Sequence, residues 1–139
     1  ALLPRALQSV PSHEHRNLTA NFAALEFRTA TGEPERARTI FESMLAEWKK
    51  WTLGWDMWCD LERSLAKQTR KTEDVERVRG LFERMASSKM KKRRARFVFK
   101  RWLEFEEELG DEKHVDAVKA RAKAFVDKLQ NGEDEEMDE

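Results

Sequence analysis

The segment WDMWCDLE at residues 55–62 recurs as FKRWLEFE at residues 99–106. In both copies an aromatic residue is followed at intervals of three by a tryptophan and then by a large apolar residue with a glutamate behind it. Residues three and four apart share one face of an α-helix, so both copies predict a helix with an aromatic stripe. A shorter third copy is Phe22-x-x-Leu25-Glu26. The repeat positions are Phe22, Glu26, Trp55, Trp58, Glu62, Phe99, Trp102 and Glu106.

A second pattern alternates with the first along the chain. ARTIFESML at residues 37–45 matches VRGLFERMA at residues 78–86, and LLPRAL at residues 2–7 matches the end of the same pattern. Arg38 and Arg79 occupy equivalent positions, where each can pair with a repeat glutamate of the partner helix. The alternation predicts an all-α fold: an α-solenoid of antiparallel helix pairs, about three pairs preceded by a partial N-terminal helix.

Polar breaks and capping residues divide the chain into helices. Ser12, Thr52 and Thr72 are expected N-caps, Asp111 opens the last helix, and Gly110 is a typical residue at a helix C-terminus. The predicted helices cover residues 13–31, 34–48, 52–67, 72–88, 91–109 and 111–130.

Composition narrows the class of protein. No apolar run reaches the length of a membrane span, and the single cysteine, Cys59, excludes an internal disulfide and favours a reducing compartment. We expect residues 1–130 to form a helical domain cut from a longer protein, and residues 131–139 to form a disordered acidic tail. Residues 132–139 hold six acids and no base, which leaves 27 bases against 21 acids in the rest of a chain of net charge zero.

These paired motifs resemble half-a-TPR (HAT) repeats, over residues 1 to about 128. The segments NFAALEF, GEPERARTIFESML, VRGLFERM and RFVFKRWLEFEEELGDEKHVDAVKARAKAFV further resemble the C-terminal domain of the family of ribosomal RNA processing protein five, or programmed cell death protein eleven. That resemblance implies a nucleolar scaffold that acts in precursor rRNA maturation for both ribosomal subunits. It also implies a structural role for the repeat Glu and Arg residues.

A basic segment, KMKKRRARFVFKR at residues 89–101, holds eight bases and no acid. Clustered bases attract phosphates and release counterions on binding, so the segment is a candidate contact for RNA or for an acidic protein segment. Alternatively it is a solvated helix face, partly paired with Glu104 or Glu108, or a nuclear localisation signal. The candidate binding residues are Lys91, Lys92, Arg93, Arg94, Arg96, Lys100 and Arg101.

Trp51 is the second candidate. Trp48, Trp51, Trp55 and Trp58 crowd into eleven residues, but Trp51 falls outside every repeated position. We therefore expect it in a turn, the most exposed of the four and available as a partner contact.

Catalytic and metal sites are not expected. The three histidines lack ligand spacing, no glycine-rich phosphate loop or nucleophile motif is present, and the charged neighbours of Cys59 are acidic. We expect that the protein is not an enzyme, that it binds no cofactor or small-molecule substrate, and that it does not associate with a membrane. The favoured function is a scaffold of ribosome biogenesis in the nucleus and nucleolus that docks assembly factors, precursor rRNA, or both. The alternative is a HAT scaffold of pre-mRNA splicing or 3′-end processing.

Overall fold

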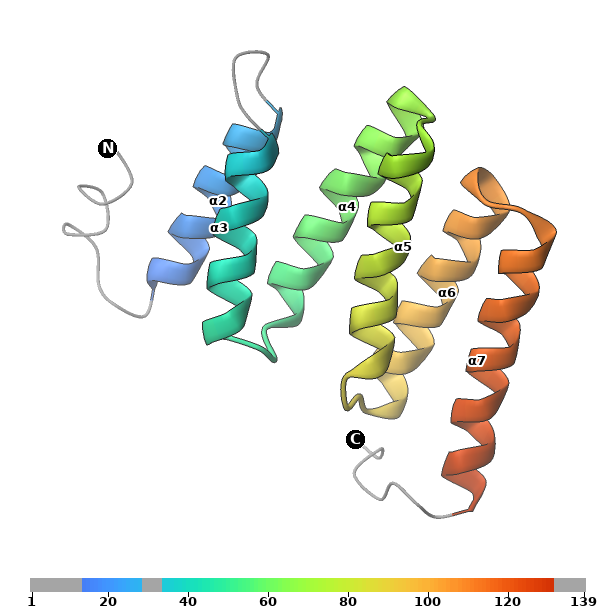
Figure 1. Cartoon of the computed structure of the whole chain (residues 1–139). Coiled ribbons are helices and arrows are strands. Elements are labelled where there is room, and N and C mark those ends of the chain that lie inside the picture. The colour runs from blue at the N-terminus through green and yellow to red at the C-terminus, as the bar shows by residue number, and fades with distance from the viewer. Residues whose placement is uncertain (1–13, 29–33, 132–139) are drawn as a thin grey trace. The chain divides into compact units, whose positions relative to one another are not determined.

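The computed structural model describes residues 14–28 and 34–131, and these residues form helices joined by short turns, with no strand among them (Figure 1). The predicted all-α repeat fold is confirmed. The partial N-terminal helix, Ser12 and the acidic tail at residues 132–139 lie outside the described residues. The helices are α2 (His15–Arg28), α3 (Pro34–Glu47), α4 (Thr52–Thr69), α5 (Thr72–Ser87), α6 (Lys92–Leu109) and α7 (Glu112–Gln130).

The chain divides into two compact units, residues 1–61 and residues 62–139, with the boundary inside α4. In the first unit α2 packs on α3. In the second unit α5 packs on α6 and α6 packs on α7. Each of these neighbours runs antiparallel to the helix before it, as the short connections require (Figure 1).

The two units repeat the same aromatic core. In the first, the rings of Phe41 and Trp58 stack with centroids 5.6 Å apart and an interplanar angle of 6°. In the second, Phe82 and Trp102 stack at 5.8 Å with the same angle of 6°. The upstream aromatic residues also correspond: Trp55 lies 6.3 Å from Trp58, and Phe99 lies 6.3 Å from Trp102. The register predicted for the two complete copies of the motif therefore holds in three dimensions.

On α2, the buried face is not the one that carries the motif residues Phe22 and Leu25. Leu25 is 60% exposed and Phe22 is only half-buried, whereas Ala20, Ala23 and Ala24 are buried. Alanines at helical spacing let α2 lie close against α3, and this small-residue face takes the place expected for the larger side chains.

Two helix starts tested the expected caps. Asp111 caps α7 as predicted, because its carboxylate accepts a hydrogen bond from the backbone N–H of His114 at 2.9 Å. Thr72 does not cap α5: the N-cap is Lys71, and it makes no side-chain capping bond. Nearby, the hydroxyl of Thr69 donates to the buried carboxylate of Asp74 at 2.6 Å, which ties the end of α4 to the first turn of α5.

Candidate functional site

The basic segment forms the turn before α6 and the first two and a half turns of that helix. Lys91 is the N-cap residue, without a side-chain capping bond, and no acidic residue lies in the first turn. Cations at a helix N-terminus oppose the helix dipole, so this placement does not stabilise the helix. Five of the predicted side chains are exposed and two, Arg94 and Arg101, are half-buried. We call Lys91, Lys92, Arg93, Arg94, Arg96, Lys100 and Arg101 the α6 basic surface.

Four of the seven basic side chains of this surface have no ion pair among the described residues. Within the part of the chain that the structure describes, no ion pair is formed by Lys92, Arg93, Arg96 or Lys100. The predicted pairing with Glu108 is wrong, because that carboxylate contacts Arg63 at 3.5 Å and Lys67 at 3.2 Å, both on α4. Four arginines elsewhere in the second unit each contact a carboxylate: Arg63, Arg77, Arg79 and Arg121.

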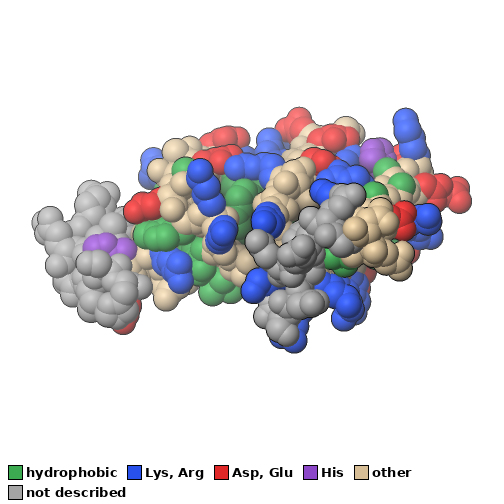
Figure 2. Space-filling model, turned by 90° about the horizontal axis from the view of Figure 1, so that it is seen from below, with side chains coloured by type: hydrophobic (Ala, Val, Ile, Leu, Met, Phe, Trp, Pro, Cys, Tyr) green, Lys and Arg blue, Asp and Glu red, His purple; other side chains and the backbone are tan. Residues whose placement is uncertain are grey.

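The surface lies at the end of the second unit where α5 turns into α6 (Figure 1). Figure 2 looks onto this end, where Lys and Arg side chains are visible at the edges of the residues drawn in grey. Basic side chains that follow one another along a helix without ion pairs attract polyanions.

Sequence reasoning missed one residue at the centre of this surface, Phe97. Its side chain is 40% exposed, and the guanidinium carbons of Arg94 and Arg101 each lie 5.4 Å from the ring centroid. Arg94 also donates from Nη2 to the sulfur of Met85 at 3.5 Å. Phe97 falls off the aromatic stripe of α6, and that was the available signal that it faces the bases instead of the core.

The repeat glutamate and arginine of the second unit form a structural pair. Arg79 and Glu106 join α5 to α6 through two hydrogen bonds of 2.7 Å, and Glu106 is 1% exposed. The hydrogen bond that Arg79 donates to Glu106 raises the pKa of the Arg79 guanidinium above its ordinary value, against the opposing effect of burial. In the first unit, Glu26 of α2 contacts Arg36 at 3.5 Å, while Arg38 contacts Glu35 one turn away.

Trp51 is not among the exposed side chains, and the expectation that it is the most exposed of the four tryptophans stays a prediction. Trp51 is half-buried, in the same class as Trp48 and Trp55, whereas Trp58 is buried. The Arg16 guanidinium lies over its ring at 4.8 Å, and a Cβ at Gly54 would stand 2.6 Å from its Cε3 atom.

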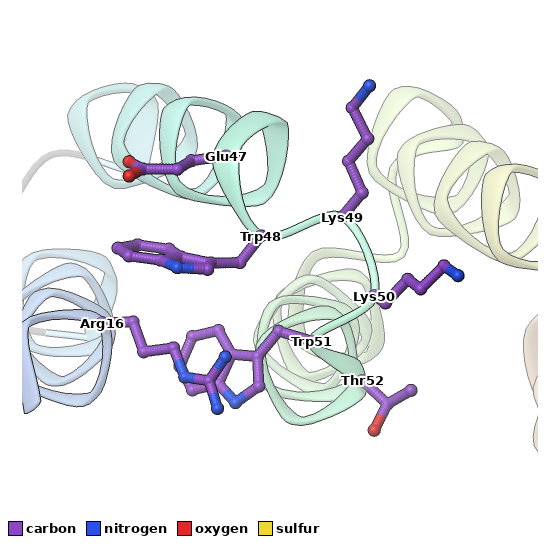
Figure 3. Close-up of a pocket in the computed structure, with 7 residues that line it drawn as sticks. All are labelled: Arg16, Glu47, Trp48, Lys49, Lys50, Trp51 and Thr52. Carbon is purple, nitrogen blue, oxygen red and sulfur yellow. The ribbon is translucent and has the colours of Figure 1, made fainter. Parts of the chain in front are cut away.

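Around Trp51 lies an open hollow of about 460 Å³ (Figure 3). Arg16 from α2 reaches across the Trp51 ring, while Lys49 and Lys50 point away from it. No carboxylate other than Glu47 lines the hollow, and its lining does not form a catalytic group of acid, base and nucleophile.

Two further kinds of site are absent from residues 14–28 and 34–131. In that portion of the chain, no group of three or more His, Cys, Asp or Glu side chains is arranged to hold a metal ion. None of its helices combines the length and apolar character needed to cross a bilayer.

Comparison with known proteins gives one family. The family model described as Suppressor of forked protein (Suf) matches residues 23–138. The rRNA biogenesis protein rrp5 of Schizosaccharomyces pombe is 39% identical over 125 residues, which is 90% of this chain and 7% of that protein. Protein RRP5 homolog of Homo sapiens is 40% identical, and rRNA biogenesis protein RRP5 of Arabidopsis thaliana is 36% identical, each over 91% of this chain and 6% of the relative. The chain thus spans 6–7% of the length of these curated relatives.

Proposed function

The chain belongs to the RRP5 family, as a HAT repeat domain of the Suf type, and from this premise we propose that it is a non-catalytic docking scaffold of ribosome biogenesis. It holds precursor rRNA, and assembly factors beside it, during rRNA processing in the nucleolus. The names of the curated relatives support ribosome assembly over the alternative of splicing or 3′-end processing.

One observation carries the proposal: among the described residues, Lys92, Arg93, Arg96 and Lys100 of the α6 basic surface form no ion pair. Phosphates that bind there release counterions without first breaking ion pairs of Lys92, Arg96 or Lys100. Because α6 packs against both α5 and α7, the backbone that carries these basic residues is folded before the ligand arrives, and binding orders only their side chains.

A scaffold role also agrees with the use of the carboxylates. Catalytic carboxylates need a pocket and a free oxygen directed into it. The carboxylate of Glu106 instead accepts from both Arg79 and the indole of Trp102, all within the interface of α5 and α6. We therefore assign Glu106 to holding the repeat together.

The RNA contact is tested with the 139-residue chain and a labelled precursor-rRNA spacer transcript in a filter-binding titration. The affinity should fall with rising salt, with a slope of about −3 in log–log form for four phosphate contacts to single-stranded RNA. Reversing the charge at Arg93→Glu, Arg96→Glu and Lys100→Glu together should abolish binding. Equal binding by this variant and the wild type would remove the α6 basic surface from the RNA contact.

A matched control carries the same change in net charge on another helix. Lys113→Glu, Lys119→Glu and Lys123→Glu alter three exposed residues of α7 and should weaken binding far less. Equal losses in the two triple variants would indicate a response to net charge alone.

The cellular role is tested by the α6 triple variant in the full-length protein that contains this domain. Northern blots should show accumulation of unprocessed precursor rRNA, while the α7 triple variant should not. Accumulation of intron-containing mRNA with normal precursor rRNA would instead support the splicing alternative and contradict the proposal.

A further inference from the structure

Among the described residues, Phe97 is the one exposed aromatic side chain. Every other Phe and Trp there is buried or half-buried. An exposed aromatic ring on a helix adds nothing to the core and leaves apolar area in water. The ring lies within a cluster of cations, and binding phosphates by charge requires no aromatic side chain. Phe97 is therefore a candidate for a different kind of ligand contact.

The position of Phe97 on α6 places its side chain among the basic residues of that helix. At 100° per residue, Phe97 lies between Arg93 and Arg101 on the exposed arc of the helix. The buried side chains Val98, Trp102 and Phe105 lie on the adjacent arc, about 80–140° around the helix from Phe97. Glu104 lies two turns beyond Phe97 on its face, so the acid-free part of the arc ends near Arg101.

Two arginines hold the ring in place. Arg94 lies one turn before Phe97 and Arg101 one turn after it, and both guanidinium groups contact the ring at 5.4 Å. Guanidinium groups and phenyl rings are both flat surfaces on which a nucleobase can stack. The hydrogen bond to Met85 restrains Arg94 further, which reduces the ordering needed on binding.

We propose that the α6 basic surface is a binding site for single-stranded RNA, in which one unpaired base stacks against the cluster of Arg94, Phe97 and Arg101. The exposed basic residues Lys92, Arg93, Arg96 and Lys100 contact the flanking phosphates. This inference rests on the proposed function and specifies its ligand: a strand with splayed bases, since the bases of a duplex are stacked inside it and present no free face.

The test measures fluorescence anisotropy of a labelled 12-nucleotide oligouridylate and of a blunt RNA duplex with the 139-residue chain. Phe97→Ala should weaken binding of the single strand about 5- to 100-fold, the range found for loss of one base–aromatic stack. Phe97→Leu should behave like Phe97→Ala because it keeps apolar bulk without a π-face, while Phe97→Tyr should stay within about threefold of the wild type.

Two readouts separate stacking from charge. The salt slope should be the same for wild type and Phe97→Ala, because the phosphate contacts remain. Binding of the duplex should not depend on residue 97. Far-UV circular dichroism of each variant should match the wild type, because the replaced side chain lies outside the core.

The outcomes distinguish this inference from the proposed function. If Phe97→Ala binds the single strand like the wild type while the Arg93, Arg96 and Lys100 reversal abolishes binding, the inference is overturned and the phosphate contact of the proposed function stands. If neither RNA binds at low salt but an oligoglutamate peptide does, the ligand is an acidic protein segment. The inference and the RNA part of the proposed function then both fail.

Discussion

Arg79 on α5 forms a bidentate ion pair with the carboxylate of Glu106 on α6: Nε donates to Oε2 and Nη2 donates to Oε1, each at 2.7 Å. Trp102 adds a third donor, its indole N–H, at 3.2 Å from Oε2. The carboxylate is 1% exposed, so these bonds replace nearly all of its contact with water. Two successive helices are thus joined by a bidentate ion pair beside the aromatic core.

Removing one partner of this pair should be costly. Glu106→Ala leaves Nε and Nη2 of Arg79 and the Trp102 N–H without their acceptor, while Arg79 keeps its contact with Glu76 at 2.6 Å. We expect the free energy of unfolding to fall by about 2–3 kcal/mol. Urea denaturation followed by circular dichroism measures it. The control is Glu83→Ala, which breaks the exposed contact of Glu83 with Arg121 and should cost less than about 1 kcal/mol. Similar losses in both variants would show that burial of the Glu106 pair has no special weight.

Two glycines should respond to alanine in opposite directions. A Cβ at Gly110 would collide with the Glu106 carboxylate, so Gly110→Ala should lower the melting temperature by disturbing the ion pair. Gly80 is exposed within α5 and a Cβ there meets nothing within 4 Å, so Gly80→Ala should stabilise the helix by about 1 kcal/mol. Differential scanning calorimetry of the two variants decides the matter; a stable Gly110→Ala protein would contradict the close approach.

Two phenylalanines of α6 should differ sharply in their weight for stability. Phe105 is 0% exposed and its ring lies 5.8 Å from that of Phe82, so Phe105→Ala should cost about 3–5 kcal/mol through lost burial and the cavity left behind. Phe97→Ala should cost only about 1 kcal/mol, because the ring is 40% exposed and its loss removes surface contacts with Arg94 and Arg101 and leaves no core cavity. Comparable losses in urea denaturation would mean that Phe97 has a structural role, and would weaken its assignment to RNA.

Acid should weaken the cap of α7. The backbone hydrogen bond from His114, followed by its side-chain bond, lowers the pKa of the Asp111 carboxyl below its ordinary value, and Arg79 contributes in the same direction. A group whose pKa is lowered by folding stabilises the protein above its ordinary pKa, and that contribution is lost as the pH falls through the lowered value. Asp111→Asn retains a capping acceptor without a charge.

The pH dependence is measured as the difference in urea midpoint between wild type and Asp111→Asn. The wild type should be the more stable near neutral pH, and the difference should vanish at acid pH, once the aspartate is protonated. The lowered pKa of Glu108, caused first by its hydrogen bond with Lys67, adds to the acid sensitivity of both proteins alike. A difference that is constant with pH would contradict the assigned cap.

Much of the fold was predictable because its signals are local. The aromatic positions Trp58 and Trp102 and the partner positions Phe41 and Phe82 follow from spacing along single helices, and the structure stacks each pair at the same angle. Asp111 was recognisable as a cap because an N-cap side chain bonds to its own first turn.

The positive charge of the candidate site was predictable from the sequence, but the ion-pair partners of the residues around it were not. Eight bases in thirteen residues are visible in the sequence, and the structure leaves Lys92, Arg96 and Lys100 exposed. The same residues did not reveal that Glu108 is engaged by Arg63 and Lys67, since those partners come from a helix about forty residues earlier.

By itself, the sequence determined the helices, the register of the two complete motifs and the excess of cations at the start of α6, because each depends on periodicity within one segment. Only the tertiary structure decided which faces are covered: it exposes Leu25 and Phe97, and it half-buries Trp51 beneath Arg16. Burial is set by what a neighbouring helix brings against a face, and the spacing of residues in one helix carries no information about that neighbour.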